Sequence, residues 1–391
     1  MIVRQFISWV RTASAGERAE ATRSLARAWL ISDLSDDDRA AAEGALLMLL
    51  DDASPLVRQA MAEVFAHSAH APAAIVQALA LDQASVALPI LEHSPLLIDA
   101  DLVDLVATGS SNVQCAIARR VRLPASVCAA IAEVGSAAAA LELIENPHAM
   151  LAPLSWDRIV ARHGHLAAIR EAMLTLDGLP PSTRLTLVAK LSETLAQFVV
   201  ARRWLSADRA ERIVGEAQDR SAVNLAARSR GDDLRQLVGH LRATGQLTAG
   251  LILRALLSGN VELFDHALTE LSGLPSSRVA ALLYGRSEAG LNALLTRAGL
   301  PPSTFPAFRA AMQATGEIGF VGTVDGAARL RRRMVERVLT RCETDADVSE
   351  PLLILLRRFA TESAREEARV FCDQLVADEI ELMPDNQRIA A

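Results

Sequence analysis

Four stretches of the sequence repeat one pattern: DDASPLVRQAMAEV (51–64), LDQASVALPILEHSP (81–95), TGSSNVQCAIARRV (108–121) and VGSAAAALELIENP (134–147). Each begins with small or turn-forming residues and continues as a helix with one apolar stripe. Val57, Val86 and Val113 occupy comparable places in three of these stretches. A period of roughly 25–29 residues is typical of stacked structural repeats, so the sequence predicts a chain of short helix pairs.

A second set of helix starts lies between these stretches. Pro72, Asp99, Pro124 and Pro153 each open an apolar-periodic segment, and they recur at nearly the same interval as the first set. Proline is tolerated in the first helical turn, because its missing N–H would have no partner there. Pro89 conflicts with this scheme, and predicts either a late helix start near Ala87 or a kink.

Two further expectations follow from the repeat. The second helices are followed by glycines, at which left-handed backbone costs little: Gly109, Gly135 and Gly164. The helices of the repeats should bury the following apolar side chains: Val57, Met61, Val86, Val113, Ile117, Val127 and Ile131. Because a short helix pair cannot bury its apolar face alone, stacked pairs should share one core.

The fold class predicted from these patterns is all-α: an α-solenoid of HEAT-like helix pairs followed by a second all-helical domain. Aromatic residues make up only 4% of the chain, which disfavours strands. DGLPPST (177–183) is the clearest linker. We therefore divide the chain into a solenoid (1–177), a second helical domain (178–315), C-terminal helices with an Arg-rich face (316–383) and a tail (384–391).

Longer helices are expected in the second half. One begins near Ser182 with an apolar stripe formed by Leu187, Val188, Leu191, Leu195 and Phe198. Separate helices are expected at 207–217 and 221–229, and again at 349–360 and 362–380. GEIGFVGTVDG (316–326) predicts a glycine-rich break before the helix at 326–342. At the N-terminus, Val3, Phe6, Ile7 and Val10 predict a short amphipathic helix.

Charge and cysteine usage exclude several classes of function. The net charge is −7, so the protein as a whole is not a binder of polyanions. Lys190 is the single lysine beside 39 arginines, so no phosphate-binding G-x-x-x-x-G-K-[ST] loop exists. The four cysteines form no C-x-x-C pair, which argues against thiolate metal sites and fits a reducing compartment: Cys115, Cys128, Cys342 and Cys372.

The amphipathic N-terminal helix could dock on a membrane surface or a partner, or simply cap the end of the core, but the chain shows no signal or membrane-spanning segment. Polar residues interrupt the apolar run at the N-terminus, so we expect no secretory signal. No stretch approaches 18 uninterrupted apolar residues, so we expect no transmembrane segment. These observations predict a cytoplasmic protein.

The sequence also resembles a known family. LLMLLDDASPLVRQAMAEVFAHS, LPILEHSPLLIDADLVDLVATG, LILRALLSGNVELFDHALTELSGLP and GLPPSTFPAFRAAM resemble the bacterial family of unknown function numbered 2336. The resemblance spans about residues 40 to 345 and, more distantly, extends to leucine-rich-repeat-variant proteins. It implies a cytoplasmic bacterial protein with HEAT-like helices. The matching stretches are structural, so the resemblance supplies no catalytic residue.

Candidate chemistry is sparse. His67 and His70 lie three residues apart at a helix end, and His163 and His165 flank Gly164; either pair could hold a metal, or simply occupy helix ends. GRSEAG (285–290) is one residue away from the nucleophile motif G-x-S-x-G, and no strand precedes it. We predict no catalytic residue, no metal site and no cofactor.

The strongest surface signal is a row of arginines in ARLRRRMVERVLTRCE (328–343). Arg329, Arg333, Arg337 and Arg341 recur every four residues and so share one broad helix face. The row is either a partner-binding site or a solvated face paired locally with Glu336.

We predict a non-catalytic protein-interaction scaffold or regulatory adaptor that binds protein partners on the repeat surface. The alternatives are a nucleic-acid-binding protein that uses the arginine face, which the acidic balance makes less favourable, and an enzyme whose motifs are not recognisable. The sequence identifies no partner and leaves the oligomeric state open.

Overall fold

The computed structural model describes residues 8–10, 12–285, 287–318, 324–345 and 348–382. Throughout these ranges the regular structure is helical, and the only β-type pairing is an isolated bridge between Leu123 and Ala149. The prediction of an all-α chain is confirmed. The chain forms two compact units, one ending at Leu179 and the other beginning at Pro180. The predicted N-terminal helix and the centre of the 316–326 break lie outside the described residues.

Unit 1 (to Leu179) consists of short helices. They are α2 (Ala15–Ile31), α3 (Asp36–Leu49), α4 (Pro55–Phe65), α5 (Ala73–Ala80), α6 (Ala84–His93), α7 (Asp99–Thr108), α8 (Ser111–Ala118), α9 (Ala125–Val134), α10 (Ala137–Glu145), α11 (Pro153–His163) and α12 (Ala167–Leu174). From α4 to α12, the even-numbered helices begin at a nearly constant interval along the chain. The odd-numbered helices from α5 to α11 begin at almost the same interval, as the two sets of start signals predicted.

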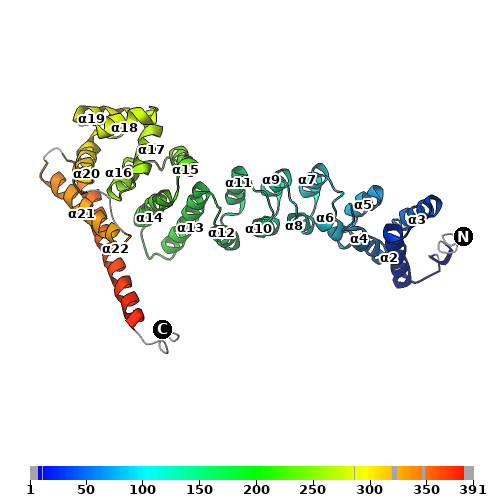
Figure 1. Cartoon of the computed structure of the whole chain (residues 1–391). Helices are drawn as coiled ribbons and strands as arrows, with labels where there is room; N and C mark the ends of the chain where they lie inside the picture. Colours follow the sequence, from blue (N-terminus) through cyan, green and yellow to red (C-terminus); the bar gives the residue numbers. More distant parts are fainter. Residues whose placement is uncertain (1–7, 11, 286, 319–323, 346–347, 383–391) are drawn as a thin grey trace. The chain divides into compact units, whose positions relative to one another are not determined.

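The helices of unit 1 form two rows. α2 packs on α4, α4 on α6, α6 on α8, α8 on α10 and α10 on α12, while α7 packs on α9 and α9 on α11 (Figure 1). All even-numbered helices up to α12, and the odd-numbered helices from α7 to α11, therefore pack on the helix two places along the chain. This arrangement lets the apolar stripes of the short helices from α4 to α12 share a core that none of them could bury alone.

The predicted core of the repeats is largely confirmed. Val57, Met61, Val86, Ile117, Val127 and Ile131 are all fully buried. Val113 is only half-buried, because it lies at the third position of α8, next to the turn at Gly109. A Cβ added at Gly109 would lie 2.6 Å from Cγ1 of Val113, so this turn is tight.

The expectation of left-handed glycines in unit 1 is wrong. Gly109, Gly135 and Gly164 have φ values of −82°, −61° and −62°. Each instead follows its helix so closely that an added Cβ would lie 2.4 to 2.5 Å from the carbonyl oxygen four residues earlier. The reason for glycine there is a close approach, and not a positive φ. Pro89 also behaves differently from the expectation of a late start, since α6 begins at Ala84 and includes Pro89.

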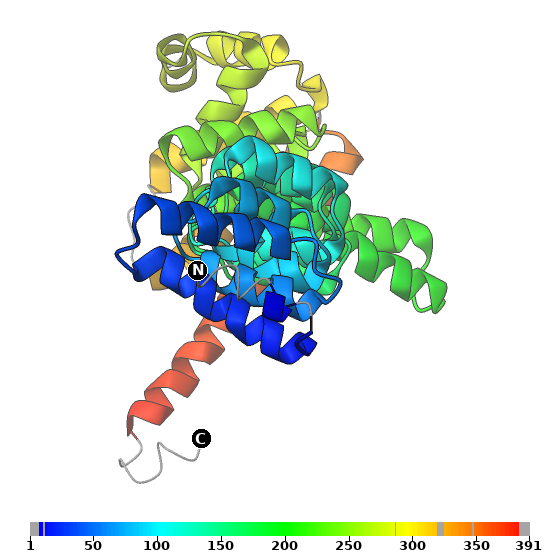
Figure 2. The ribbon, with the colours of Figure 1, turned by 90° about the vertical axis from the view of Figure 1, so that its right-hand side faces the viewer.

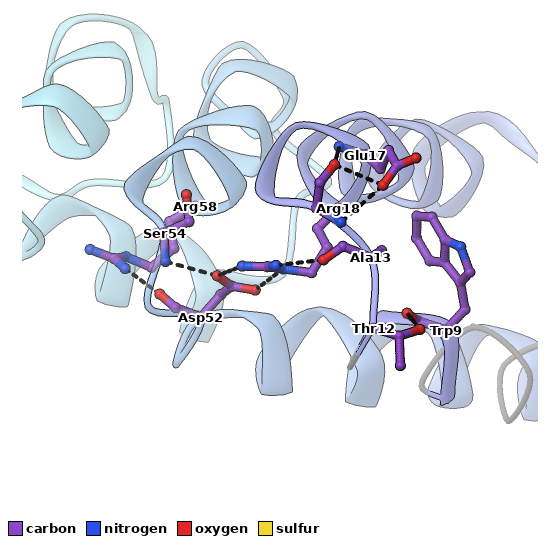
Figure 3. A network of polar contacts seen from close by, with 9 residues as sticks. Trp9, Thr12, Ala13, Glu17, Arg18, Asp52, Ser54 and Arg58 are labelled. Carbon is purple, nitrogen blue, oxygen red and sulfur yellow. Dashed lines mark hydrogen bonds and ion pairs between the residues drawn. The ribbon is translucent and has the colours of Figure 1, made fainter.

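Polar contacts tie each repeat of unit 1 to the next. The guanidinium of Arg18 donates to both oxygens of Asp52 at 2.8 Å, and Asp52 accepts from the backbone N–H of Ser54 (Figure 3). One repeat later, Arg58 pairs with Asp82 at 2.5 and 3.0 Å. Further along, the buried Arg120 donates to the carbonyls of Leu91 and Ser94, both at 2.6 Å. These contacts fix the loops of neighbouring repeats against one another.

Unit 2 (from Pro180) contains longer elements. They are α13 (Pro181–Ala201), α14 (Ala207–Arg228), α15 (Gly231–Ala243), α16 (Ala249–Leu257), α17 (Val261–Ser272), α18 (Ser276–Tyr284), α19 (Glu288–Arg297), the 3₁₀ turn η1 (Pro302–Thr304), α20 (Phe305–Ile318), α21 (Val324–Glu343) and α22 (Glu350–Leu382). The larger core lies between α16 and α22 and contains Phe264, Phe308 and Met334. A smaller one joins α13, α14 and α15 around Leu185, Val223 and Leu237.

Two predicted helix breaks do not exist. α14 runs unbroken through residues 217–221, and α22 runs unbroken through 360–362. Small polar residues at these points bond within the helix. The hydroxyl of Ser221 donates to the carbonyl of Ala217 at 2.9 Å, and that of Thr361 donates to the carbonyl of Arg357 at 3.0 Å. These hydroxyl groups therefore find hydrogen-bond acceptors inside the helix and do not end it.

The apolar stripe of α13 is buried only near the base of the α13–α14 hairpin. Leu187, at the start of the predicted apolar stripe, is fully buried, whereas Leu195 and Phe198 are 56% and 48% exposed. Lys190 lies at the transition, half-exposed and 3.8 Å from Glu193. The expected stripe is thus present, but its second half faces away from the core of unit 2.

Candidate functional site

The arginine row of α21 lies on the side of a firmly anchored helix. Met334, Val335, Val338 and Cys342 of α21 are at most 2% exposed and belong to the core shared with α20 and α22. Burial raises the pKa of the Cys342 thiol to about 11, so it is a neutral core residue. Because these apolar positions face inward, the arginine row lies on the other side of α21, whereas Arg331 turns toward α16 and α22.

The structure places the four predicted binding residues in two different environments. Arg329 and Arg341, near the two ends of the row, contact neighbouring helices: Nε of Arg329 lies 3.4 Å from Glu367 of α22, and Nη1 of Arg341 donates to Gln313 of α20 at 3.2 Å. Arg333 and Arg337 lie between them and are exposed. The row therefore combines structural contacts at its ends with two exposed guanidinium groups at its centre.

Acidic residues neutralise part of this face. Arg332 donates to Glu336 at 2.7 Å and to Glu367 at 2.9 Å, so the predicted local pair with Glu336 is confirmed. The guanidinium of Arg332 is the main reason that the pKa of Glu367 lies below its usual range. Arg333 and Arg337 add two further exposed guanidinium groups to this face.

A second constellation, which the sequence did not indicate, lies in a cleft bounded by α14, α16, α21 and α22. The cleft comprises two adjoining cavities of about 140 and 560 Å³. Both cavities are lined by the same polar group, namely Arg220, Arg254, Glu362 and Glu366, together with Phe359. Arg254 and Glu362 are 108 residues apart, so no local motif could have indicated their contact.

Arg254 is the centre of this cleft. Its side chain is 9% exposed, its Nη1 lies 2.7 Å from both carboxylate oxygens of Glu362, and its guanidinium carbon lies 4.4 Å from the ring centre of Phe359. Arg220 reaches the same carboxylate at 3.5 Å. The Nε atoms of Arg254 and of Arg331, which also lines the smaller cavity, are buried without a hydrogen-bond partner. These ion pairs join α14, α16 and α22.

Asp219 lies beside this network on α14. Burial raises the pKa of its carboxyl to about 6, and the negative charges of Glu216 and Glu362 act in the same direction, while Arg254 opposes them. The group is therefore partly protonated slightly below neutral pH. The ion pairs and the buried carboxyl of Asp219 together hold α14, α16 and α22 around the cleft.

The histidines that the sequence singled out lie at helix ends or in the connections between helices. The rings of His67 and His93, from consecutive repeats, lie 4.3 Å apart with an angle of 31° between their planes. Nε2 of His163 lies 3.2 Å from the carbonyl oxygen of Gly135, and burial lowers its pKa. Within the described ranges, no group of three His, Cys, Asp or Glu side chains is placed to hold a metal ion.

The remaining sequence candidates have structural roles. Ser287, from the near-miss nucleophile motif, caps α19 by accepting from the backbone N–H of Gly290 at 3.3 Å. Cys115 and Cys128 are buried in α8 and α9 as small core residues. Among the helices of the described residues, none is both long enough and apolar enough to cross a membrane.

Comparison with known proteins identifies the family. The model of an uncharacterised protein family conserved in bacteria, DUF2336, matches residues 86–346, which is about two thirds of the chain. The chain belongs to this family. The DUF2336 match begins in α6 and ends just after α21. It therefore includes the arginine row, about half of unit 1 and most of unit 2, whereas residues 40–85 lie outside it. No curated protein and no solved structure gave a significant match.

Proposed function

We propose that this DUF2336 protein is a non-catalytic scaffold or adaptor of the bacterial cytoplasm, and that unit 1 is a HEAT-like solenoid. The observation that carries the proposal is the pair of helix rows in unit 1, in which the even-numbered helices from α2 to α12 and the odd-numbered helices from α7 to α11 pack on the helix two places along. Such stacking buries a continuous core and leaves extended surfaces for partners. The repeated Arg–Asp ties, from Arg18 to Asp52 and from Arg58 to Asp82, support a regular repeat.

We assign the partner-binding role in unit 2 to the arginine row, Arg329, Arg333, Arg337 and Arg341. The exposed central pair, Arg333 and Arg337, supplies positive charge in a chain of net charge −7. A local positive surface on an acidic protein suits an acidic surface of another protein, because complementary charge orients the encounter. The many carboxylates around the row, such as Glu336 and Glu367, oppose an extended polyanion and therefore favour a protein partner over nucleic acid.

Charge reversal at the centre of the row tests this assignment. Arg333→Glu with Arg337→Glu, expressed in the native host, should reduce recovery of co-purifying acidic proteins by at least about tenfold, the equivalent of about 1.4 kcal/mol. Melting temperature should change little, because exposed substitutions usually alter stability by at most about 0.5 kcal/mol. Quantitative mass spectrometry of the co-purified proteins gives the first result, and calorimetry gives the second.

A matched control separates a docking site from a general effect of charge. Arg228→Glu with Arg278→Glu makes the same change in net charge at exposed positions of α14 and α18, and should retain the partners. Equal loss in both variants would contradict a specific role for the row. Loss of duplex DNA binding at low salt, with protein partners unchanged, would favour the nucleic-acid alternative.

A further inference from the structure

Unit 2 exposes an apolar surface at the end of the α13–α14 hairpin. Leu195, Phe198 and Trp204 are 56%, 48% and 66% exposed, and we call these three residues the hairpin tip. The rings of Phe198 and Trp204 lie 5.7 Å apart in an edge-to-face arrangement. Because these rings pack on each other and not on the core, the tip is ordered yet uncovered within the described structure.

The hairpin tip is surrounded by positive charge. The guanidinium carbon of Arg202 lies 5.3 Å from the ring centre of Phe198. Arg203, at φ +59°, forms the turn between the two helices. Arg209 and Arg212 follow on the first turns of α14, and all four arginines are exposed. In the part of the chain that the structure describes, none of the four forms an ion pair, so their charge is available to a partner.

The far half of α22 has the complementary character. Phe371, Leu375 and Val376 are 54%, 52% and 56% exposed, and we call them the α22 stripe. A groove of about 210 Å³ between α21 and α22 adjoins the stripe and is lined by Ala368 and Phe371 together with Arg329, Arg332 and Glu367. The last ten residues of α22, 373–382, include four acidic residues and no basic residue.

These two surfaces lie at opposite ends of unit 2. Arg358 of α22 pairs with Glu216 of α14 at 3.2 Å, and Glu362 pairs with Arg220 at 3.5 Å, so both helices advance four residues between contacts and run in the same direction. The hairpin tip lies on the N-terminal side of these contacts along α14, and the stripe lies on their C-terminal side along α22. At 1.5 Å per helical residue, the two surfaces are on the order of 40 Å apart. Figure 2 shows the α13–α14 hairpin (green) and the end of α22 (red) projecting to opposite sides. The two surfaces cannot meet within one chain.

We propose that the occupant of each surface is a second copy of this chain, with the hairpin tip of one copy on the α22 stripe of the other. A twofold axis perpendicular to α14 exchanges the two ends, so one arrangement forms both contacts at once and closes the assembly as a dimer. Near the midpoint, Ile213 and Ile354 are 45% and 44% exposed at the mouth of the larger cleft cavity, and the same dimer would cover them. Apolar contact with opposite charge at each end is what such an interface requires.

Complementation between two variants of the full chain tests the dimer. Phe198→Asp with Trp204→Asp removes the hairpin tip, and Leu375→Asp with Val376→Asp removes the stripe. In analytical ultracentrifugation, the dimer dissociation constant of each variant alone should rise by at least about tenfold. In such a homodimer, both contacts lack the same substituted surface. An equimolar mixture should recover a heterodimer, because the intact tip of one variant meets the intact stripe of the other.

The control variant carries Leu81→Asp with Leu154→Asp, which are exposed apolar residues of unit 1 at 76% and 79%. It should dimerise like the wild type, and circular dichroism should show equal helix content in all variants. A monomeric wild type, unchanged dimerisation of either variant, or a mixture that stays monomeric would each overturn the proposal. Binding of a monomeric wild type to phosphatidylserine vesicles, lost with the hairpin tip, would assign that surface to lipid instead.

Discussion

The two units end their helices in different ways. In unit 1, described residues have no positive φ, and helices end in extended or right-handed residues held by side chains of neighbouring repeats. In unit 2, five glycines have positive φ: Gly231, Gly245, Gly259, Gly273 and Gly299. After α15, α16 and α19, the residue following the glycine donates back across the last helical turn, as Asn260 does to the carbonyl of Ala255 at 2.9 Å. The helices of unit 1 are thus held from one repeat to the next, whereas α15, α16 and α19 of unit 2 are capped within the helix itself.

This difference predicts how far the effect of a destabilising substitution should extend in each unit. In unit 1 a lost contact weakens two neighbouring repeats, because each helix depends on those before and after it. In unit 2 the helices that are capped internally are joined by a few distant contacts, such as that of Arg254 with Glu362. Substitutions in the two units should therefore differ in how many helices they destabilise, as well as in how much free energy of unfolding they cost.

The largest effect is expected for the core of unit 1. Ile117→Ala should reduce the free energy of unfolding by about 2–5 kcal/mol, because the side chain is fully buried and its removal leaves a cavity. Hydrogen-exchange mass spectrometry should show lost protection from α6 to α10, with α16 to α20 unchanged. The exposed Leu154→Ala is the control, and an effect of Ile117→Ala below about 0.5 kcal/mol would contradict the repeat register.

A smaller effect is expected for the ties between repeats. Arg120→Met should cost about 1–3 kcal/mol, because the carbonyls of Leu91 and Ser94 lose their buried donor. The neighbouring Arg119→Met removes an exposed ion pair with Glu142 and should cost at most about 1 kcal/mol. Urea unfolding of both variants measures the difference. Equal costs would show that the inter-repeat bonds contribute no more than surface charge.

The smallest effect, which depends on pH, is expected in unit 2. Because the pKa of Asp219 rises from 3.8 to about 6 on folding, the folded state binds more protons between these values, and stability falls as pH rises through this window. Asp219→Asn keeps the uncharged form and should stabilise the protein by about 1–2 kcal/mol at pH 7. Chemical unfolding at pH 7 and pH 4 should show this gain at pH 7 and none at pH 4. A gain of equal size at both pH values would point to a cause other than titration.

The sequence predicts unit 1 better than unit 2 for a physical reason. The repeated starts at Ser54, Ser110 and Ser136 reflect contacts between residues one or two repeats apart, so the pattern is visible in the chain itself. The cleft of unit 2 joins Arg254 to Glu362 across 108 residues, and no period relates them. Sequence patterns also indicated that Leu195 and Phe198 are apolar, but could not show that the hairpin extends beyond the core that would cover them.

The arginine row shows the same limit. Its spacing correctly placed Arg329, Arg333, Arg337 and Arg341 along one helix, and the pair of Arg332 with Glu336 was visible locally. The contact of Arg329 with Glu367 depends on how α22 returns along α21, which no local pattern encodes. The prediction divided two continuous helices, α14 and α22, whereas the hydroxyls of Ser221 and Thr361 bond within the helix and leave it unbroken.

The single lysine gives this molecule an unusual chemical property. Lys190 is half-exposed on α13, one turn before Leu195, and every other basic side chain except histidine is an arginine. An amine-reactive dye would therefore label one side chain, besides any free α-amino group, and would place it on the exposed part of the hairpin. For the same reason, lysine-to-lysine crosslinkers would detect almost no contacts within one copy of the chain. Any Lys190–Lys190 product would instead show that two copies are in contact.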